Sequence, residues 1–505
     1  MSDEPTPSPA AGDGSEGGLA RKAAAGAAWS IGQNLLTRVT AFVTVLILAR
    51  LLSPADFGVV TIAATLIPIL QVLADLGITM YVQQHPAPTK LIYDTYFWTS
   101  ASIALVGGCV LFFCAPFIAD LFGEPSAGSV MQAISPTALL VSLGAVPQTM
   151  QRKELRFRAI AVQGVIAALV SQAVAVATAL AGLGVWALVL QTLTLQFLAT
   201  LLAWISTRYR PSFQFSWSEL RHMVRFGGNY VVSTGFQTAA QLLINFVVTS
   251  TLGVSALGYL NIVQRLVNVV TGVVLTAVVQ VSTVAFAMIR ESVERLRSGY
   301  LRSFSTLYTL LVPIMVFIAA SAEHLVPFMY GDQWGRSIGP GMILAITGIF
   351  FVDALEHSLY AGIGKPALWT VYAFYSSVVL VIAAWIGSFG GLLGVAWAGL
   401  IGELVVTMIR WFVSGRQIRA PWWAMIAAFG RIGIPGAAAA AAGYLVAWLT
   451  RGIPDLLGVV LVGLAVLVVF LPIFRLTAHA TWDELAGLIR HGLERIRRRR
   501  AATAP

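Results

Sequence analysis

The sequence predicts an all-α protein that crosses a membrane many times, and three observations support this fold class. Hydrophobic residues make up 58% of the 505 residues and charged residues only 11%, whereas soluble domains contain about 25% charged residues. The hydrophobic residues form long continuous runs, unlike the short alternating strands of a membrane β-barrel. Lys and Arg gather in alternate connections between these runs, which favours a membrane surface over nucleic acid as the origin of the +10 charge.

The hydrophobic runs are long enough to cross a bilayer, whose hydrocarbon core of about 30 Å needs roughly 20 apolar residues per helix. We identify 14 runs of this length, and this number places both termini on one side of the membrane. The expected spans are 26–49, 58–81, 96–118, 128–150, 159–181, 184–206, 226–251, 257–286, 303–322, 338–363, 366–387, 391–412, 431–450 and 456–476.

The basic residues predict which side holds the termini. Most of the 32 Lys and Arg residues fall in the segments on the side of the two termini, among them four Arg counted in 410–431. The opposite loops contain only Arg50, Arg336 and Arg451. The positive-inside rule therefore makes both termini cytoplasmic.

The two ends of the chain differ from the spans in composition. Residues 1–25 begin with a stretch rich in Pro, Gly, Ser and acidic residues and are expected to be disordered. Residues 477–505 have the pattern of a basic amphipathic helix, with Trp482 on its apolar face and four arginines near its end, so we expect it to lie on anionic lipid. The alternative is a solvated tail that only helps to set the topology.

A faint internal repeat relates residues 26–75 to residues 226–275. Both copies contain an apolar span, a short turn and a second apolar span, which is a repeated helical hairpin. Each copy also contains one arginine inside a span, Arg38 in the first and Arg265 in the second. The positions that coincide at an offset of 200 are Leu52 and Leu252, Gly58 and Gly258, Ile62 and Ile262, and Leu66 and Leu266.

The two arginines are the main candidate site residues. A charge in the middle of a membrane helix costs about 2.5–3.5 kcal/mol, so it is expected beside a wet cavity or a partner. Each of the four repeat helices has a polar side, which predicts a shared hydrophilic space between two halves. The planar guanidinium suits phosphate, so this space favours an anion. The candidate lining residues are Gln33, Asn34, Asn229, Gln237, Gln241, Asn261, Gln264 and Asn268.

A structural role for the arginines is the alternative to binding: each would pair with a carboxylate, Arg38 with Asp75 for instance, and only hold helices together.

Four titratable residues are candidates for ion coupling: Asp75, Asp353, Glu356 and His357. Carboxylates and an imidazole inside spans could exchange a proton or hold Na⁺ as a counter-transported ion. The alternative is that they are wetted or paired. Glu403 is a lone candidate of the same kind. The sequence contains no P-loop, dinucleotide-binding, metal-binding or hydrolase motif, so we expect no enzymatic activity and no cofactor beyond a coupling H⁺ or Na⁺.

Four segments of the chain carry a family resemblance: ARLLSPADFGVVTIA (49–63), QRKELRFRAIA (151–161), ALGYLNIVQRLVNV (256–269) and YGDQWGRSIGPGMILA (330–345). Together they resemble the Wzx-type oligosaccharide flippases of the multidrug/oligosaccharidyl-lipid/polysaccharide exporter superfamily, in particular the colanic-acid and exopolysaccharide exporters. The resemblance implies an N-lobe (26–206) and a C-lobe (226–413) of six helices each around a central cavity. It further implies a basic interfacial linker (207–225) and two additional helices within 414–476.

The cargo implied by the resemblance is an undecaprenyl-diphosphate-linked oligosaccharide. It would move from the cytoplasmic to the outer leaflet of the bacterial plasma (inner) membrane by alternating access, for exopolysaccharide, capsule or O-antigen synthesis. Arg38 and Arg265 would hold the diphosphate, while the Asn and Gln side chains would receive sugar hydroxyls. Polysaccharide polymerase and glycosyltransferase machinery would be its partners.

Three other functions stay open at this point. A lipid II flippase would share the number of spans and a cationic cavity. A multidrug or cation antiporter of the same superfamily would instead show an acidic cavity. A membrane polysaccharide polymerase would need a larger outward loop than any expected here.

Overall fold

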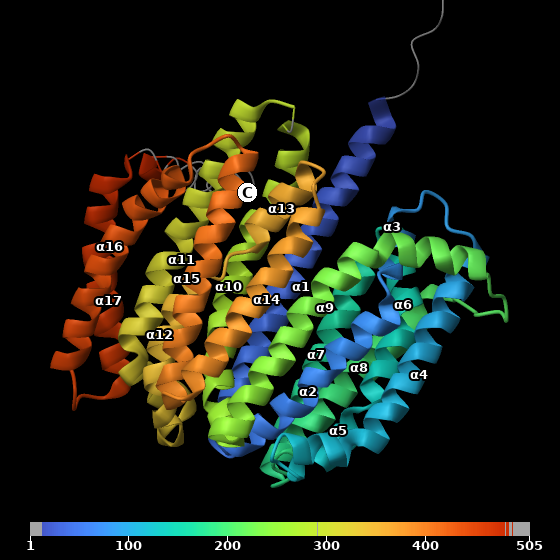
Figure 1. The fold of residues 1–505 in the computed structure, drawn as a ribbon, viewed down its shortest axis with the longest axis horizontal. Helices are drawn as coiled ribbons and strands as arrows, with labels where there is room; N and C mark the ends of the chain where they lie inside the picture. Colours follow the sequence, from blue (N-terminus) through green and yellow to red (C-terminus); the bar gives the residue numbers. More distant parts are fainter. Residues whose placement is uncertain (1–12, 290, 480, 484–486, 488–505) are drawn as a thin grey trace, which may run out of the picture.

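The computed structural model describes residues 13–289, 291–479, 481–483 and 487, and every regular element in these ranges is a helix (Figure 1). Fourteen helical segments of the described chain are long and apolar enough to cross a membrane. The predicted all-α, many-span fold class is confirmed.

Two bundles stand side by side in Figure 1, and we refer to them as the N-lobe and the C-lobe. The N-lobe contains α1 (Asp13–Leu51), α2 (Pro54–Asp75), α3 (Ile78–Gln84), α4 (Lys90–Leu121), α5 (Ser126–Ile134), α6 (Pro136–Lys153), α7 (Phe157–Leu180) and α8 (Trp186–Thr207).

The C-lobe is followed by two further long helices that lie against its outer side in Figure 1. It contains α9 (Trp217–Leu252), α10 (Val254–Ile289), α11 (Val293–Tyr330), the 3₁₀ helix η1 (Asp332–Ser337), α12 (Ile338–Phe350), α13 (Ala354–Gly362), α14 (Ala367–Ser388) and α15 (Gly391–Gln417). The last two helices are α16 (Trp422–Leu449) and α17 (Asp455–Thr477).

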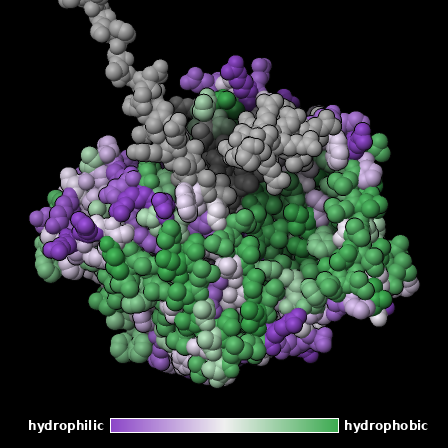
Figure 2. Space-filling view, turned by 180° about the vertical axis from the view of Figure 1, so that it is seen from behind, coloured by the Kyte–Doolittle hydropathy of each residue, from purple (hydrophilic) through white to green (hydrophobic). Residues whose placement is uncertain are grey.

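The surface has the distribution that a bilayer requires. Figure 2 shows a broad hydrophobic belt around the middle of one face, with hydrophilic residues gathered at both ends. Large apolar side chains such as Phe113 and Val468 are exposed within spans, where lipid can cover them. We call the end at which α2 and α10 begin the outer end, and the end at which α9 begins the inner end.

Two helices begin earlier than the composition suggests. α1 begins at Asp13, within the range 1–25 that we expected to be disordered, because an Ala-rich stretch before the first span favours helix; residues 1–12 lie outside the described residues. α9 begins at Trp217, so half of the expected interfacial linker is the start of a spanning helix, with the Ser216 hydroxyl accepting from the Glu219 N–H (3.3 Å). The predicted tail helix lies outside the described residues beyond Asp483, except for Gly487.

Two of the expected spans are interrupted. The fourth divides at Ser135 into α5 and α6, and Pro136 occupies the first turn of α6, where a missing N–H does no harm. The tenth divides into α12 and α13 around residues 351–353. No proline or glycine marks the second interruption in the sequence.

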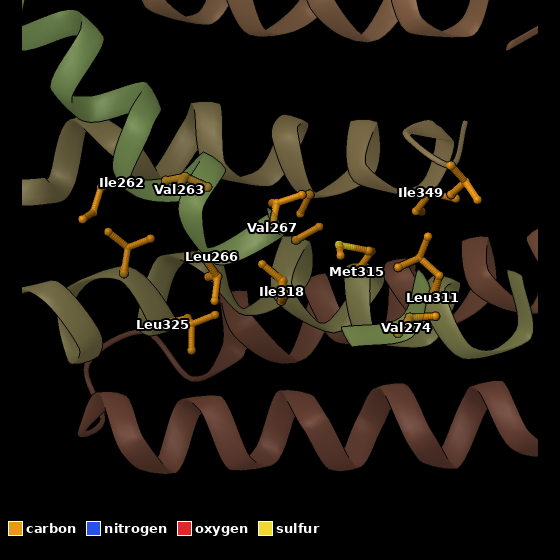
Figure 3. Packing of buried hydrophobic residues seen from close by; sticks show 14 of the residues in the cluster. Ile262, Val263, Leu266, Val267, Val274, Leu311, Met315, Ile318, Leu325 and Ile349 are labelled. Carbon is orange, nitrogen blue, oxygen red and sulfur yellow. The ribbon is translucent and has the colours of Figure 1, made fainter. Parts of the chain in front are cut away.

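The packing of α10 fixes which of its faces the N-lobe meets. Figure 3 shows the apolar residues of α10, among them Val263 and Val267, between helices α11 and α12, with Met315 of α11 next to Val267. Residues three to four positions apart lie on one helical face, so Val263 and Val267 face the C-lobe core and Arg265 lies on the opposite side of α10. Arg265 therefore points away from that core.

Candidate functional site

Arg265 lies on the side of α10 that faces the N-lobe. Its Nε donates a hydrogen bond to Asn261 Oδ1 (2.8 Å), one helical turn earlier. Its guanidinium lies over the ring of Phe57 on α2, 5.5 Å from the ring centre, where a cation–π attraction operates. Both contacts orient the guanidinium without neutralising its charge.

Arg38 reaches across from α1 to the same face of α10. Its guanidinium lies directly against Gly272, two helical turns after Arg265, and a Cβ atom at position 272 would overlap it. The absence of a side chain on Gly272 is therefore what leaves room for the Arg38 guanidinium between the lobes.

The two arginines line one cavity of about 290 Å³ between α1 and α10. Among the described residues, neither guanidinium forms an ion pair with a carboxylate, and Asp75 is not the partner of Arg38. The cavity thus has two uncompensated positive charges, one from each lobe. Its other lining residues are Ala41, Phe42, Val45, Asn268 and Val269.

Asp75 lies in a different and larger cavity, of about 580 Å³, lined by α2, α3, α4, α6 and α9. The Asp75 carboxylate accepts hydrogen bonds from the Thr79 hydroxyl and from the Tyr96 hydroxyl, the latter at 3.0 Å. The sequence analysis missed most of this cavity because its polar residues are distributed over five helices, which only the fold brings together. The polar side chains that also line it include Gln71, Gln83, Gln148, Arg152, Tyr230 and Thr234.

Four of the predicted lining residues line neither the arginine cavity nor the C-lobe cavity described below. Gln33 faces α7, where its amide packs against Gly164, and it lines an apolar pocket between α1 and α7. Asn34 and Asn229 are exposed, and Gln237 is half-buried without lining a described pocket. The polar stripe of α1 is thus divided: Arg38 faces α10, and Gln33 faces its own lobe.

A further cavity of about 290 Å³, which we call the C-lobe cavity, is lined by helices of the C-lobe, and Gln241, Asn261, Gln264 and Asn268 line it together with Glu403. Gln264 donates to Asn268 (3.1 Å), and Asn268 also lines the arginine cavity. The two cavities are therefore neighbours that share this residue.

Asn245 of α9 is a polar residue that the sequence analysis missed. It accepts a hydrogen bond from Gln241 (2.9 Å) and donates one to the Thr65 hydroxyl of α2 (2.7 Å), so it connects the lobes. The four-residue spacing Ser233, Gln237, Gln241 already pointed to position 245.

The structure does not bring Asp353, Glu356 and His357 into one cluster. Glu356 is buried and faces Arg410 (Nε to Oε1, 3.7 Å), and it also accepts a hydrogen bond from the Tyr300 hydroxyl (2.9 Å). His357 is exposed and packs on Trp369, while Asp353 precedes α13. The expected three-member cluster is therefore an ion pair inside the C-lobe and two separate side chains.

Arg410 corrects one assignment made from the sequence. We counted it with the basic residues of the loop after the twelfth span, but α15 continues to Gln417 and the Arg410 side chain is fully buried. Its Nη2 donates to the Phe350 carbonyl (2.8 Å) at the end of α12. Arg410 thus compensates both the Glu356 charge and a carbonyl at the interruption of the tenth span.

Residues 47–339 match the model of the family described as "Polysaccharide biosynthesis protein". The chain belongs to this family. The match confirms, at the level of the family, the resemblance that the four sequence segments indicated. Both arginine-bearing repeat hairpins fall at least partly inside the matched range, and the Arg265 side of the cavity lies entirely within it.

Two curated relatives cover about three quarters of the chain. The succinoglycan biosynthesis transport protein ExoT of Rhizobium meliloti (strain 1021) is 28% identical over 392 residues, covering 76% of this chain and 78% of the relative. The lipopolysaccharide biosynthesis protein WzxC of Escherichia coli (strain K12) is 22% identical over 408 residues, covering 79% of this chain and 82% of the relative.

Solved structures support the fold independently. The inward closed conformation of the lipid II flippase MurJ superposes with a TM-score of 0.71 at 16% identity, covering 88% of this chain and 98% of the other. An inward-facing multidrug resistance transporter of the MATE family superposes with a TM-score of 0.64 at 18% identity, covering 76% of this chain and 94% of the other. Both similarities show that this chain shares the fold of these two proteins over most of its length.

Proposed function

We propose that this membrane protein is a flippase that moves an undecaprenyl-diphosphate-linked oligosaccharide repeat unit from the cytoplasmic to the outer leaflet of the plasma membrane. The observation that carries the proposal is the cavity that Arg38 and Arg265 line together, one from each lobe, with no carboxylate paired to either among the described residues. Two guanidinium groups in one cavity favour a multiply charged anion such as a diphosphate.

The family and the relatives agree with this proposal. Both relatives are named for the biosynthesis of extracellular or surface polysaccharides, and one is named a transport protein. The amide-rich cavity in the C-lobe borders the arginine cavity through Asn268, and amides can exchange hydrogen bonds with sugar hydroxyls.

The sign of the charge separates this proposal from the other functions. A transporter of organic cations needs unpaired carboxylates in its central cavity, and the arginine cavity has none among its described lining residues. Lipid II also has a diphosphate, so the charge of the arginine cavity does not separate the two lipids. A preference for one of them has to come from contacts with the sugar part of the cargo. A polymerase is disfavoured because α11 and η1 leave no long outward loop between residues 323 and 339.

Purified protein in liposomes would test the proposal. We expect it to carry a fluorescently labelled undecaprenyl-diphosphate oligosaccharide across the bilayer, measured as the fraction of label that an impermeant quencher reaches over time. Protein-free liposomes give the background rate, and a labelled organic cation serves as the competing cargo. Lipid transfer no faster than background, or transfer of the cation alone, would contradict the proposed function.

We further propose that Glu403 couples transport to H⁺ or Na⁺. It is only 2% exposed, it lines the C-lobe cavity, and its Oε1 has no hydrogen-bond partner among the described residues. A buried carboxylate with one unpartnered oxygen favours uptake of a proton or a cation. Glu356 is less suited to this role because Arg410 and Tyr300 already occupy its Oε1 side.

Exchanging each carboxylate for an amide should separate the two roles. Glu403→Gln is expected to leave the amount of folded protein unchanged and to remove the dependence of lipid transfer on an imposed proton or sodium gradient. Glu356→Gln, the matched control, leaves Arg410 as a buried charge without its partner, which costs about 3–5 kcal/mol, so the yield of folded protein should fall. Unchanged ion dependence in Glu403→Gln would rule out coupling through this residue.

A further inference from the structure

A groove of about 940 Å³ lies at the inner end, on the side of the molecule away from the arginine cavity. Its walls are formed by one turn of α4 and by the first two turns of α9, and Leu76 at the end of α2 closes it. Figure 1 shows the start of α9 lying across the inner end of the N-lobe, while its later turns run along the C-lobe. The lining residues are Leu76, Trp98, Thr99, Ser102, Ile103, Phe215, Trp217, Leu220, Arg221, Val224 and Arg225.

The α4 wall is held in place by the connection between the lobes. Trp98 donates its indole N–H to the Ser212 carbonyl (2.9 Å) and stacks on Phe213, with ring centres 4.9 Å apart. The Ser212 hydroxyl in turn donates to the carboxylate of Asp94, which is fully buried in α4. Trp98, which lines the groove, is thus held in place by the segment that leads into α9.

The segment itself is fixed at two further points. The hydroxyl of Tyr209 donates to Asp94 Oδ1 (2.6 Å), and burial together with the neighbouring Asp94 raises the pKa of Tyr209, so the phenol stays protonated and keeps donating. The Ser216 N–H donates to the Thr95 hydroxyl (3.1 Å), and the Ser216 side chain caps α9. The connection before α9 and the first turn of α9, which form one wall of the groove, are therefore held against α4, which forms the other wall.

The chemistry of the groove has two parts. Its floor is apolar and aromatic, whereas Arg221 and Arg225, one turn apart on α9, are exposed along its edge. Neither arginine forms an ion pair among the described residues, and no acidic side chain is part of the described lining. Glu219 lies nearby on α9 but outside the lining. An apolar channel with a pair of free guanidinium groups complements a molecule with a hydrocarbon chain and a phosphate.

We propose that this groove binds one anionic glycerophospholipid, with its phosphate on Arg221 and Arg225 and an acyl chain between α4 and α9. Trp98 and Trp217 lie in the groove, and tryptophans are enriched at the boundary between hydrocarbon and head groups. The orientation proposed above places the groove in the cytoplasmic leaflet, where anionic lipids attract basic residues. The lipid is a resident of the protein and distinct from the cargo.

The position of the groove suggests what the bound lipid does. It would contact α4 of the N-lobe and α9, whose later turns belong to the C-lobe, close to the point where the lobes touch at the inner end. There Gly77, in the left-handed region at φ 71°, packs against Gly227 of α9 so closely that a Cβ on either residue would overlap the other backbone. A lipid in the groove would therefore hold the start of α9 on the N-lobe next to this contact.

Photo-crosslinking would test the site. Full-length protein is reconstituted with a diazirine-labelled phosphatidylglycerol or with the same probe on phosphatidylcholine, and crosslinked peptides are mapped by mass spectrometry. We expect phosphatidylglycerol, and not phosphatidylcholine, to label residues 98–103 and 215–225. The double variant Arg221→Gln/Arg225→Gln should reduce this labelling at least tenfold, because each basic side chain near an anionic head group raises the affinity about fivefold.

Two further variants separate a groove-bound lipid from a general attraction of charge. Arg295→Gln/Arg297→Gln removes two exposed arginines at the start of α11 and should leave labelling of the groove unchanged. Ser102→Trp keeps both arginines and fills the groove, so it should reduce the labelling as strongly as the arginine variant.

Four results would overturn the proposal: equal labelling by the two lipids, unchanged labelling in Arg221→Gln/Arg225→Gln, full competition by inorganic phosphate, or displacement by an equal amount of undecaprenyl diphosphate. Because labelling needs no transport, these results are independent of whether the protein moves its proposed cargo.

Discussion

Arg265→Ala is expected to reduce lipid transfer to the level of protein-free liposomes while the amount of folded protein stays unchanged. Hydrogen bonds to charged groups contribute about 1.5–3 kcal/mol each, so the loss of a two-pronged contact with a diphosphate weakens binding on the order of a hundredfold or more. Folding should tolerate the change, because the guanidinium contacts Asn261 and the ring of Phe57 and forms no ion pair among the described residues. The labelled-lipid assay measures transfer, and size-exclusion profiles measure folded protein.

Matched substitutions would show that the arginine charge is what matters. Arg265→Lys keeps the positive charge but loses the planar guanidinium that can bind phosphate through two hydrogen bonds. We therefore expect a rate of lipid transfer between those of the wild type and Arg265→Ala. Gly272→Ala should displace the Arg38 guanidinium and slow transfer, whereas Gly235→Ala, at a position with no neighbour within 4 Å, should not. Normal transfer by Arg265→Ala would remove this residue from the mechanism and, with it, the main support for an anionic cargo.

The sequence was sufficient to place two arginines together because their positions follow from simple patterns. The apolar stripe of α10, at a spacing of three and four residues, dictates that Arg265 lies opposite Val263 and Val267. The repeat predicts that the first copy meets the second. Periodicity on a single helix therefore carries enough information wherever one face is apolar and the other is not.

The division of the α1 stripe could not be read from the sequence. Gln33 and Arg38 are both polar residues near one edge of the stripe, yet Gln33 faces Gly164 within its own lobe and Arg38 faces Gly272 across the interface. Which neighbour each side chain meets depends on glycines more than a hundred residues away. The periodicity of a single helix shows which residues share a face, but it does not show which other elements pack on that face.

Arg410 and the interrupted tenth span were missed for the same reason. The segment around Phe351 contains no helix breaker, and the interruption is compensated by a side chain from α15, whose Nη2 bonds to the Phe350 carbonyl. Arg410 stands at the end of an apolar run and therefore resembles a loop residue in the sequence. Its burial depends on Glu356, 54 positions earlier, and the pairing of two such residues is a property of the folded C-lobe.

At the outer end, equivalent residues of the two repeat copies contact each other and join the lobes. Gly58 of α2 packs against the Val254 carbonyl at the start of α10, and Gly258 of α10 packs against the Pro54 carbonyl at the start of α2; a Cβ on either glycine would overlap the opposite backbone. Pro54 and Val254 differ by the same offset of 200 as Gly58 and Gly258. The two helices thus cross through a reciprocal pair of glycines, which allow a close backbone approach.

Gly58→Val or Gly258→Val is therefore expected to abolish lipid transfer by preventing closure of the outer end. Backbone atoms on the opposite helix cannot move aside as a flexible side chain can, so the lobes have to separate there. A cysteine introduced at Val269, which lines the arginine cavity, should become reactive to an impermeant thiol reagent added outside, in a background lacking Cys109 and Cys114. Gly430→Val is the control, because it adds the same side chain to α16 where no atom lies within 4 Å. If both gate variants transfer lipid normally and position 269 stays protected, the glycine crossing is not a gate and cargo must leave by another route.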